Sequence, residues 1–295
     1  MRRAAILTLL LSIAGSRASF ADQVIYSEKS LYRNIYVSED GDLICMRFLL
    51  RNGGRQSCRD VRSPKHLVFN YTKMMMGALY LSPELPKNVL ILGLGGGTLP
   101  KAVRLAAPDA EITAVEIDPA VLKVAERFFE YKPDAHMETV ISDGRVFVRK
   151  MQREGRRFDL IMLDAYDQEY IPEHMLTREF LTEVSSLLTD DGVLAANTFT
   201  SSRLYSHEST TYRAVFGPFY NLRTENRVIL LKKGGLPPME FVAARAEALD
   251  PLLRPMDVRQ DWMLDMFSTE QNWDTAARVL TDDYSPSNLL NGPAR

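Results

Sequence analysis

The stretch Asn88 to Asp118, NVLILGLGGGTLPKAVRLAAPDAEITAVEID, decides the fold of this chain. Val89 to Leu92 form an unbroken apolar run, as expected of a buried parallel strand, and a glycine-rich turn follows at once. A helix is predicted after this turn, and Ile112 to Val115 form a second strand that ends in Glu116. The spacing therefore predicts a strand–helix–strand unit of a parallel sheet.

The glycine-rich turn indicates a nucleotide-like ligand. Gly93, Gly95 and Gly97 let the backbone approach such a ligand closely, and Glu116 at the next strand end can accept hydrogen bonds from both ribose hydroxyls. A dinucleotide fingerprint requires glycine or alanine at its sixth position, where this chain has Thr98. The turn therefore argues against NAD as the ligand.

A third strand end carries a further acid. A helix predicted over 121–129 leads to a strand near 138–141, which ends in Asp143-Gly144-Arg145. Asp143 suits the adenine amino group, although the residue could also simply cap the next helix. Strand ends that carry Gly-x-Gly, Glu and Asp in this order resemble the class I fold that binds S-adenosylmethionine or its decarboxylated form. We therefore place Gly144 with Asp143 in a nucleoside site on a doubly wound, Rossmann-like α/β fold.

Composition bounds the size and the partners of the protein. The chain has 295 residues, of which 46% are hydrophobic, so it can pack one large domain or a large and a small one. Its net charge of −2 gives no electrostatic reason to bind nucleic acid or an anionic membrane. We therefore expect no nucleic-acid partner.

Residues 1–21 have the pattern of a secretory signal peptide. Arg2-Arg3 precede an apolar stretch from Ala4 to Gly15, and Ser19-Phe20-Ala21 match a cleavage site. The alternative is an uncleaved membrane anchor, but the apolar stretch is shorter than the roughly 20 residues that span a bilayer. We therefore predict export, to a bacterial periplasm, without stable membrane insertion; the protein would be cytoplasmic if the signal is not used.

Residues 22–64 are predicted to form a small antiparallel β domain. Cys45 and Cys58 are the chain's only cysteines, and they flank the turn signal Arg51-Asn52-Gly53-Gly54. Cross-strand partners of such a hairpin lie close to this pair, and an oxidising compartment would let a disulfide form. The alternative is two ordinary buried thiols.

Residues 65–295 are predicted to form the Rossmann-like domain. Its first segment, 65–81, is rich in methionine and is expected to be a helix that bridges the two domains, with its methionines as core filler. A fourth strand, Phe158 to Leu163, enters the loop Asp164-Ala165-Tyr166-Asp167. Further helices are expected over 177–188, 210–216, 238–248 and 271–280, with a fifth strand at 193–197 and antiparallel strands within 221–231.

The order of these motifs resembles the spermidine synthase (polyamine aminopropyltransferase) family over residues 32–199. The motifs that carry the resemblance are Gly53-x-x-Gln56, Gly93-Leu94-Gly95-Gly96-Gly97, Glu116-Ile117-Asp118, Asp143-Gly144-Arg145-x-Phe147, Asp164-x-x-Asp167 and Leu176-Thr177-x-Glu179-Phe180. The resemblance implies transfer of an aminopropyl group from decarboxylated S-adenosylmethionine to an amine acceptor such as putrescine, which releases methylthioadenosine. It also implies a dimer through the β domains.

The resemblance implies a role for each site residue. Glu116 would hold the ribose, Asp143 the adenine, and Gln56 the aminopropyl end of the donor. Asp164 would orient and deprotonate the attacking amine, with Asp167 beside it on a gating loop. An amine is nucleophilic once neutral, so the protein needs to position it and to accept one proton.

The chain departs from the family pattern in two places, the glycine turn and the segment Tyr71-Thr72-Lys73. Gly96 stands where the family carries an aspartate that grips the amine of the donor, and Tyr71-Thr72-Lys73 stand where it has Tyr-His-Glu. Lys73 would repel putrescine if it faced the pocket. An S-adenosylmethionine-dependent methyltransferase acting on a small nucleophile and a non-catalytic nucleoside-binding protein are therefore kept as alternatives.

The histidines do not indicate a metal site. His174 and His207 lack partners at metal-ligand spacing, so we expect both to be structural or surface residues. No metal is predicted, and the donor co-substrate is the only cofactor-like ligand expected.

Overall fold

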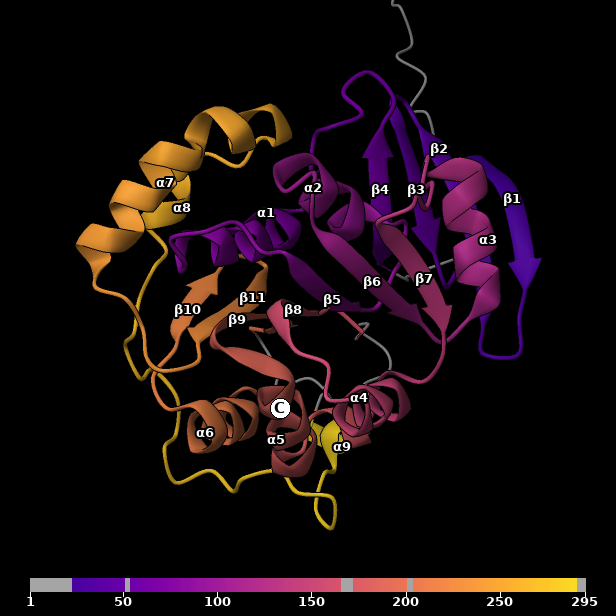
Figure 1. The fold of residues 1–295 in the computed structure, drawn as a ribbon. Coiled ribbons are helices and arrows are strands. Elements are labelled where there is room, and N and C mark those ends of the chain that lie inside the picture. Colours follow the sequence, from indigo (N-terminus) through magenta and orange to yellow (C-terminus); the bar gives the residue numbers. More distant parts are fainter. Residues whose placement is uncertain (1–22, 51–53, 166–171, 201–203, 291–295) are drawn as a thin grey trace, which may run out of the picture.

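The small sheet is antiparallel and lies at the N-terminal end of the chain (Figure 1). The computed structural model describes residues 23–50, 54–165, 172–200 and 204–290. The strands of this sheet, in spatial order, are β1 (Gln23–Lys29), β2 (Asn34–Asp40), β3 (Leu43–Arg47) and β4 (Arg55–Asp60). The predicted signal peptide lies outside the described residues, and the predicted division at residue 64 falls between β4 and the first helix.

The two cysteines are cross-strand partners in the hairpin of β3 and β4. Cys45 pairs with Cys58 in the antiparallel register, and their sulfur atoms form a disulfide across a Cα–Cα distance of 4.1 Å. The alternative of two free thiols is therefore wrong for this structure. The turn that the sequence predicts between the strands falls partly at 51–53, outside the described residues.

The large sheet contains the strand order β10-β11-β9-β8-β5-β6-β7. Its strands are β5 (Asn88–Leu92), β6 (Glu111–Glu116), β7 (Met137–Ile141), β8 (Phe158–Leu163), β9 (Leu188–Phe199), β10 (Tyr220–Arg223) and β11 (Asn226–Lys232). The pairs among β5 to β9 are parallel, and β10 and β11 extend the sheet antiparallel. This arrangement confirms the α/β fold class and the antiparallel end of the sheet.

Helices cover both faces of the large sheet (Figure 1). The helices are α1 (Asn70–Met76), α2 (Thr98–Ala106), α3 (Pro119–Phe128), α4 (Gly144–Arg153), α5 (Arg178–Leu187), α6 (Leu204–Phe216), α7 (Met239–Leu253), α8 (Gln260–Leu264) and α9 (Ser287–Leu290). Along β5, Val89 and Ile91 join the core with α1, α2 and α7, whereas Leu90 and Leu92 join the core with α4, α5 and α6. The continuous apolar run of β5 is thus explained by burial on both faces.

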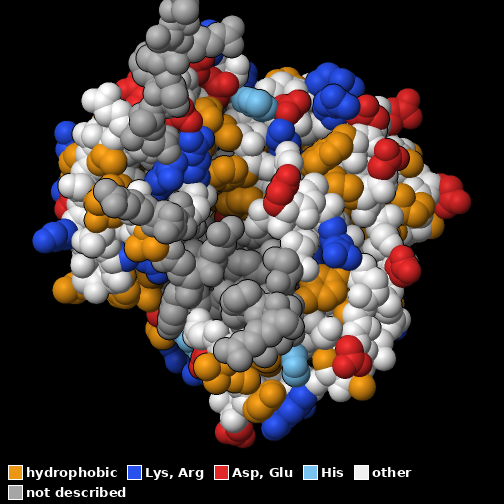
Figure 2. Space-filling model, turned by 180° about the vertical axis from the view of Figure 1, so that it is seen from behind, with side chains coloured by type: hydrophobic (Ala, Val, Ile, Leu, Met, Phe, Trp, Pro, Cys, Tyr) orange, Lys and Arg blue, Asp and Glu red, His pale blue; other side chains and the backbone are white. Residues whose placement is uncertain are grey.

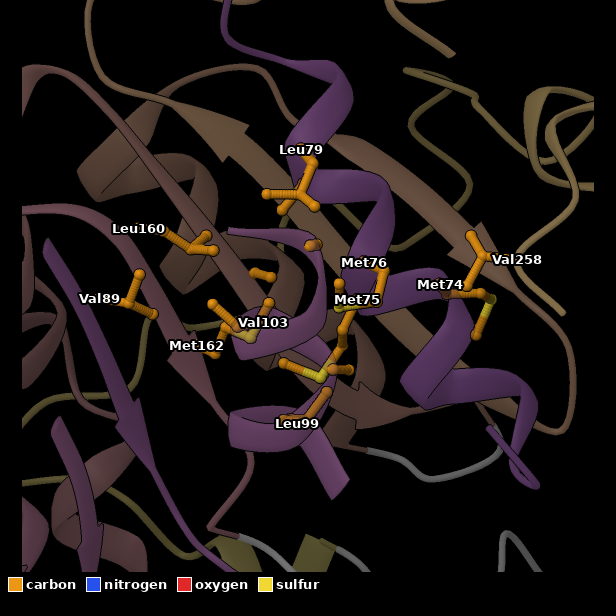
Figure 3. Packing of buried hydrophobic residues seen from close by; sticks show 14 of the residues in the cluster. Met74, Met75, Met76, Leu79, Val89, Leu99, Val103, Leu160, Met162 and Val258 are labelled. Atoms are coloured by element: carbon orange, nitrogen blue, oxygen red, sulfur yellow. The ribbon is translucent and has the colours of Figure 1, made fainter. Parts of the chain in front are cut away.

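The methionine-rich segment fills the core on one face of the large sheet. Met74, Met75 and Met76 of α1 are fully buried, and they pack among side chains of β5, α2 and β8 (Figure 3). The helix is shorter than expected, because it begins at Asn70 and tightens into the 3₁₀ helix η1 (Gly77–Tyr80). The prediction that these methionines serve as core filler is confirmed.

The helix expected over 271–280 does not form. This segment makes turns, and Asp274 accepts a hydrogen bond from the backbone N–H of Ala276. Most of its residues are exposed, so no apolar face is available to hold a helix against the core. Side chains such as Asp that bond nearby backbone groups compete with helix formation.

The surface carries mixed charges. On the face shown in Figure 2, the Lys and Arg side chains are interspersed with Asp and Glu side chains, in keeping with the net charge of −2. In the described part of the chain, no helix is both long enough and apolar enough to cross a membrane.

Candidate active site

A pocket of about 550 Å³ lies where the carboxyl ends of β5, β6 and β8 meet the small sheet. The predicted site residues that line it are Gln56, Gly93, Gly95, Glu116, Asp143, Gly144 and Asp164. The carboxyl ends of adjacent parallel strands converge on one edge of a sheet, which is why residues from distant parts of the sequence meet here. Asp167 lies outside the described residues.

The turn after β5 brings two strand ends together. Gly93 has φ 103°, and a Cβ there would lie 2.2 Å from the backbone oxygen of Asp164. Only glycine therefore fits at this position, both for its left-handed backbone and for the close approach. Gly97 precedes α2 and packs against the Tyr131 ring, so it supports the turn without lining the pocket.

Gly96 is closely covered. Its N–H donates to Ser57 Oγ at 2.8 Å, and a Cβ at this position would lie 2.7 Å from Phe129 Cδ1 and 3.0 Å from Ser57 Cβ. Phe129 is only 1% exposed, so its ring cannot move aside into solvent. The position where the family carries an aspartate thus has no room for any side chain here.

Glu116 is fixed by the backbone around it. Its two carboxylate oxygens accept hydrogen bonds from the N–H groups of Leu94, at 3.1 Å, and Asp118, at 3.0 Å. Burial raises the pKa of Glu116, while these hydrogen bonds oppose the rise. The side chain is therefore held in one orientation at the edge of the pocket. Asp118 instead caps α3 through the N–H of Ala120.

Asp143 has both a capping role and a place in the pocket. Its Oδ1 accepts the N–H of Val146 at 2.9 Å, which caps α4, and its Oδ2 lies 3.1 Å from His174 Nε2. The capping alternative and the pocket assignment thus apply to the same carboxylate. His174, which the sequence suggested only as a structural or surface residue, lines the pocket from the 3₁₀ helix η2 (Glu173–Met175).

Asp164 is the acid best suited to accept a proton. Asn197 Nδ2 donates to its Oδ1 at 2.9 Å, and the Tyr71 hydroxyl donates to its Oδ2 at 3.3 Å. Burial raises the pKa of Asp164 to about 7, and the hydrogen bonds from Asn197 and Tyr71 oppose the rise. A carboxylate with such a pKa can exchange a proton near neutral pH.

Tyr71 and Asn197 line the same pocket, and residue-by-residue pattern reading missed their contact with Asp164. Asn197 stands near the end of β9, so the rule that site residues follow parallel strands could have found it. Tyr71 lies on α1 at the tyrosine of the Tyr-His-Glu motif of the resembled family, and that match was the sequence signal that could have found it.

Lys73 does not reach the pocket. Its ammonium group pairs with Asp257 Oδ2 at 2.5 Å, and its side chain is 11% exposed. The repulsion of a diamine that would follow from a pocket-facing lysine therefore does not arise. Within the described ranges, no group of three or more His, Cys, Asp or Glu side chains is arranged to hold a metal ion.

Comparison with known proteins places this site in a family. Residues 68–219 match the spermine/spermidine synthase domain. A polyamine aminopropyltransferase of Vibrio vulnificus (strain CMCP6) is 41% identical over 273 residues, which are 90% of this chain and 91% of the relative.

Solved structures share the fold. A spermidine synthase in complex with the transition-state analogue AdoDATO has a TM-score of 0.66 at 22% identity, with 84% of this chain and 85% of that chain covered. Human methyltransferase-like protein 13 in complex with SAH has a TM-score of 0.57 at 29% identity, over 63% of this chain and 93% of that chain. The domain match, the close relative and the arrangement of acids at the strand ends agree, and the chain belongs to the spermine/spermidine synthase family.

Proposed function

We propose that the protein is a polyamine aminopropyltransferase, which moves the aminopropyl group of decarboxylated S-adenosylmethionine to an amine such as putrescine. The observation that carries this proposal is Asp164, a carboxylate with a pKa raised to about 7 that shares one pocket with Glu116 and Asp143. The identity of 41% to a polyamine aminopropyltransferase over nearly the whole chain supports the same activity.

The reaction requires that the attacking amine be positioned next to the donor carbon and that one group accept a proton. The nitrogen of the acceptor attacks the carbon next to the sulfonium, the carbon–sulfur bond breaks, and methylthioadenosine leaves as a neutral thioether. Asp164 takes the proton that the new secondary ammonium loses, while Tyr71 and Asn197 hold its carboxylate in place. Glu116 and Asp143 are assigned to the ribose and the adenine, and Gln56 to the aminopropyl end.

Product analysis tests this proposal. Purified protein is incubated with decarboxylated S-adenosylmethionine and putrescine, and the products are identified by mass spectrometry. We expect spermidine and methylthioadenosine in equal amounts. A Glu116→Ala variant should bind methylthioadenosine about 10- to 100-fold more weakly, because charge-assisted hydrogen bonds to the ribose are lost. Absence of both products with every amine tried would refute the proposed transfer.

A second candidate is methyl transfer from S-adenosylmethionine to a small nucleophile. It is favoured by Gly96, because the turn has neither a carboxylate nor the space for one at the position that grips the amine of a decarboxylated donor in the family. The 29% identity to a methyltransferase structure determined with SAH supports it further. The same assay with S-adenosylmethionine distinguishes the two, since methyl transfer releases S-adenosylhomocysteine. If neither donor yields product but calorimetry detects nucleoside binding, the protein is a binding protein.

We also propose that the protein is exported and acts in the periplasm. The proposal rests on the signal pattern of residues 1–21, and the Cys45–Cys58 disulfide is consistent with an oxidising compartment. N-terminal sequencing of the protein from its native host should find a mature chain that begins near Asp22. A chain that begins at Met1 in the cytosolic fraction would contradict export. The dimer that the resemblance implies is tested by the mass of the protein in light scattering.

A further inference from the structure

Arg145 is the centre of an ion-pair cluster next to the nucleoside side of the pocket. Its side chain is 7% exposed, and its guanidinium contacts Glu183 of α5 through Nε and Nη2, at 2.8 and 2.9 Å. The same guanidinium contacts Asp282 through Nη1 and Nη2, at 2.7 and 2.8 Å, and Nη1 also donates to the backbone oxygen of His174 at 3.0 Å. All five donors of this arginine are therefore used.

The cluster ties the C-terminal segment to η2. Residues 280–288, here called the C-terminal segment, run beside η2 and the start of α5. Ser285 Oγ donates to the backbone oxygen of Glu173 at 2.8 Å, and the side chain of Asn288 donates to Glu173 Oε1 at 3.2 Å. The hydroxyl of Thr177, which follows η2, donates to Asp282 Oδ1 at 2.7 Å. The position of η2 therefore depends on residues that lie more than a hundred positions later in the sequence.

Two residues of η2 form part of the pocket wall. His174 contacts Asp143, and the Met175 side chain lies against Gly144, where an added Cβ would be 2.9 Å from the Met175 methyl carbon. A 3₁₀ turn of this length has little stability of its own, so its place is set by what packs around it. The carboxylate of Asp143 accepts from Val146 on Oδ1 and contacts His174 on Oδ2, so loss of the His174 contact would remove one of the two contacts that orient it.

We propose that the C-terminal segment contributes to nucleoside binding by positioning η2. Asp282 holds Arg145, and through Arg145 and η2 it keeps His174 against Asp143. Asp282 and Arg145 are thus positioning residues for the adenine end of the donor. The inference rests on the proposed function, because it assigns the adenine to Asp143. It predicts that changes in the C-terminal segment weaken nucleoside binding without slowing the chemical step.

The test uses Asp282→Asn in the full-length protein, with Asp134→Asn as the matched control. Asp134 also pairs with an arginine through two hydrogen bonds, Arg104 Nε at 3.0 Å and Nη2 at 2.8 Å, and its side chain is 46% exposed compared with 41% for Asp282. Calorimetry with methylthioadenosine should show a Kd about 5- to 10-fold higher for Asp282→Asn, and within about twofold of wild type for Asp134→Asn. The donor KM should rise likewise while kcat stays within about twofold of wild type.

Hydrogen exchange of the ligand-free proteins supplies a readout that needs no nucleoside. The backbone N–H groups of Met175 and Leu176 donate to the backbone oxygens of Pro172 and Glu173, at 2.9 and 3.3 Å. These amides should exchange faster in Asp282→Asn and at an unchanged rate in Asp134→Asn. Both the faster exchange and the weaker binding are required. If the exchange is unchanged, or if the affinity is unchanged although the exchange is faster, the proposal is overturned.

A second variant covers the case that Asp282→Asn does not fold. His174→Ala removes a side chain that is 46% exposed, so the fold should tolerate it, and it should weaken methylthioadenosine binding by a similar factor. Wild-type affinity in His174→Ala would overturn the proposal. Failure of the wild-type protein to bind methylthioadenosine refutes the proposed function instead, which distinguishes the two results.

Discussion

At the scale of single residues, the site depends on how one acid is surrounded. Asp164 directly follows β8 and lines the pocket, and burial is the main cause of its raised pKa of about 7. Tyr71 and Asn197 donate hydrogen bonds to its two oxygens, and these bonds fix the orientation of the carboxylate. Orientation and a pKa near the working pH are what a proton acceptor requires.

The first prediction concerns the proton acceptor. Asp164→Asn keeps the size of the side chain but removes its ability to take a proton, so turnover should fall by about 100-fold or more. Methylthioadenosine binding should stay within a few fold, because Glu116 and Asp143 are untouched. Steady-state kinetics and calorimetry on the same preparation measure the two effects. Full transfer activity in this variant would show that Asp164 has no catalytic role.

The second prediction follows from the sign of the pKa shift. The carboxylate form is needed to accept a proton, so kcat/KM should rise with pH through about 7. In the unfolded chain Asp164 ionises near the ordinary pKa of about 3.9, whereas in the folded protein it stays protonated up to about pH 7. The free energy of unfolding of the wild type should therefore fall as pH rises from about 3.9 to about 7. Asp164→Asn should therefore have a higher melting temperature than the wild type above pH 7, and the difference between the two melting temperatures should shrink as pH falls. A constant difference across this range would contradict the raised pKa.

The third prediction concerns Gly96. Its backbone does not have positive φ, so a side chain there is opposed by contacts and not by backbone strain. Gly96→Ala should lower the free energy of unfolding by about 1 to 3 kcal/mol, because the new Cβ overlaps Phe129. Adding Phe129→Leu should recover part of that loss, although Phe129→Leu alone destabilises the protein. Urea unfolding of the single and double variants measures this coupling, and independent, additive losses would argue against the contact.

At the scale of elements, a disulfide between Cys45 and Cys58 links the two strands of the β3–β4 hairpin. The disulfide joins residues separated by 13 positions, so it closes a short loop in the unfolded chain. This hairpin also contributes Gln56 and Ser57 to the pocket and to the glycine turn. The disulfide therefore stabilises an element on which the donor site depends.

The fourth prediction is a loss of stability when the disulfide is removed. The Cys45→Ser/Cys58→Ser variant should have a free energy of unfolding lower by about 3 kcal/mol, mainly because its unfolded state is less constrained. Urea titrations with and without dithiothreitol measure the effect. Reductant should shift the wild-type midpoint toward that of the variant, and it should leave the variant unchanged. If the urea midpoint of the wild type does not change with reductant, the disulfide is absent or does not contribute to stability.

At the scale of the whole molecule, the pocket joins two parts of the fold. The small sheet supplies Gln56, while Glu116, Asp143 and Asp164 come from the strand ends of the large sheet. Between the two sheets, Gly96 N donates to Ser57 Oγ, and α3 packs against Ile35 and Val37 of β2. A ligand that fills the pocket would therefore contact both parts at once.

The fifth prediction is that nucleoside binding stabilises both parts together. Methylthioadenosine at 100 times its Kd should add about 2.7 kcal/mol to the free energy of unfolding. Differential scanning calorimetry should show one unfolding transition, and its temperature should rise when the ligand is added. Two transitions, of which only one responds to the ligand, would contradict a pocket shared between the sheets.

The sequence by itself determined the class of the fold and the acids of the site. The apolar run of β5, the glycine turn and the acids Glu116, Asp143 and Asp164 are local patterns. Because the carboxyl ends of adjacent parallel strands converge, the strand order alone brings these acids to one edge of the sheet. The cysteine spacing around the turn signal likewise made Cys45 and Cys58 candidate partners, which the β3–β4 register confirms.

Only the tertiary structure decided which further side chains reach the pocket. Tyr71 meets Asp164 across 93 positions, and the contact of Asp282 with Arg145 spans 137, so no local pattern encodes either. Lys73 points away because Asp257 pairs with it, and the segment 271–280 forms turns because it has little apolar surface to bury as a helix. Such outcomes depend on which distant groups can satisfy a buried charge or cover an apolar face, and those groups become neighbours only when the chain is folded.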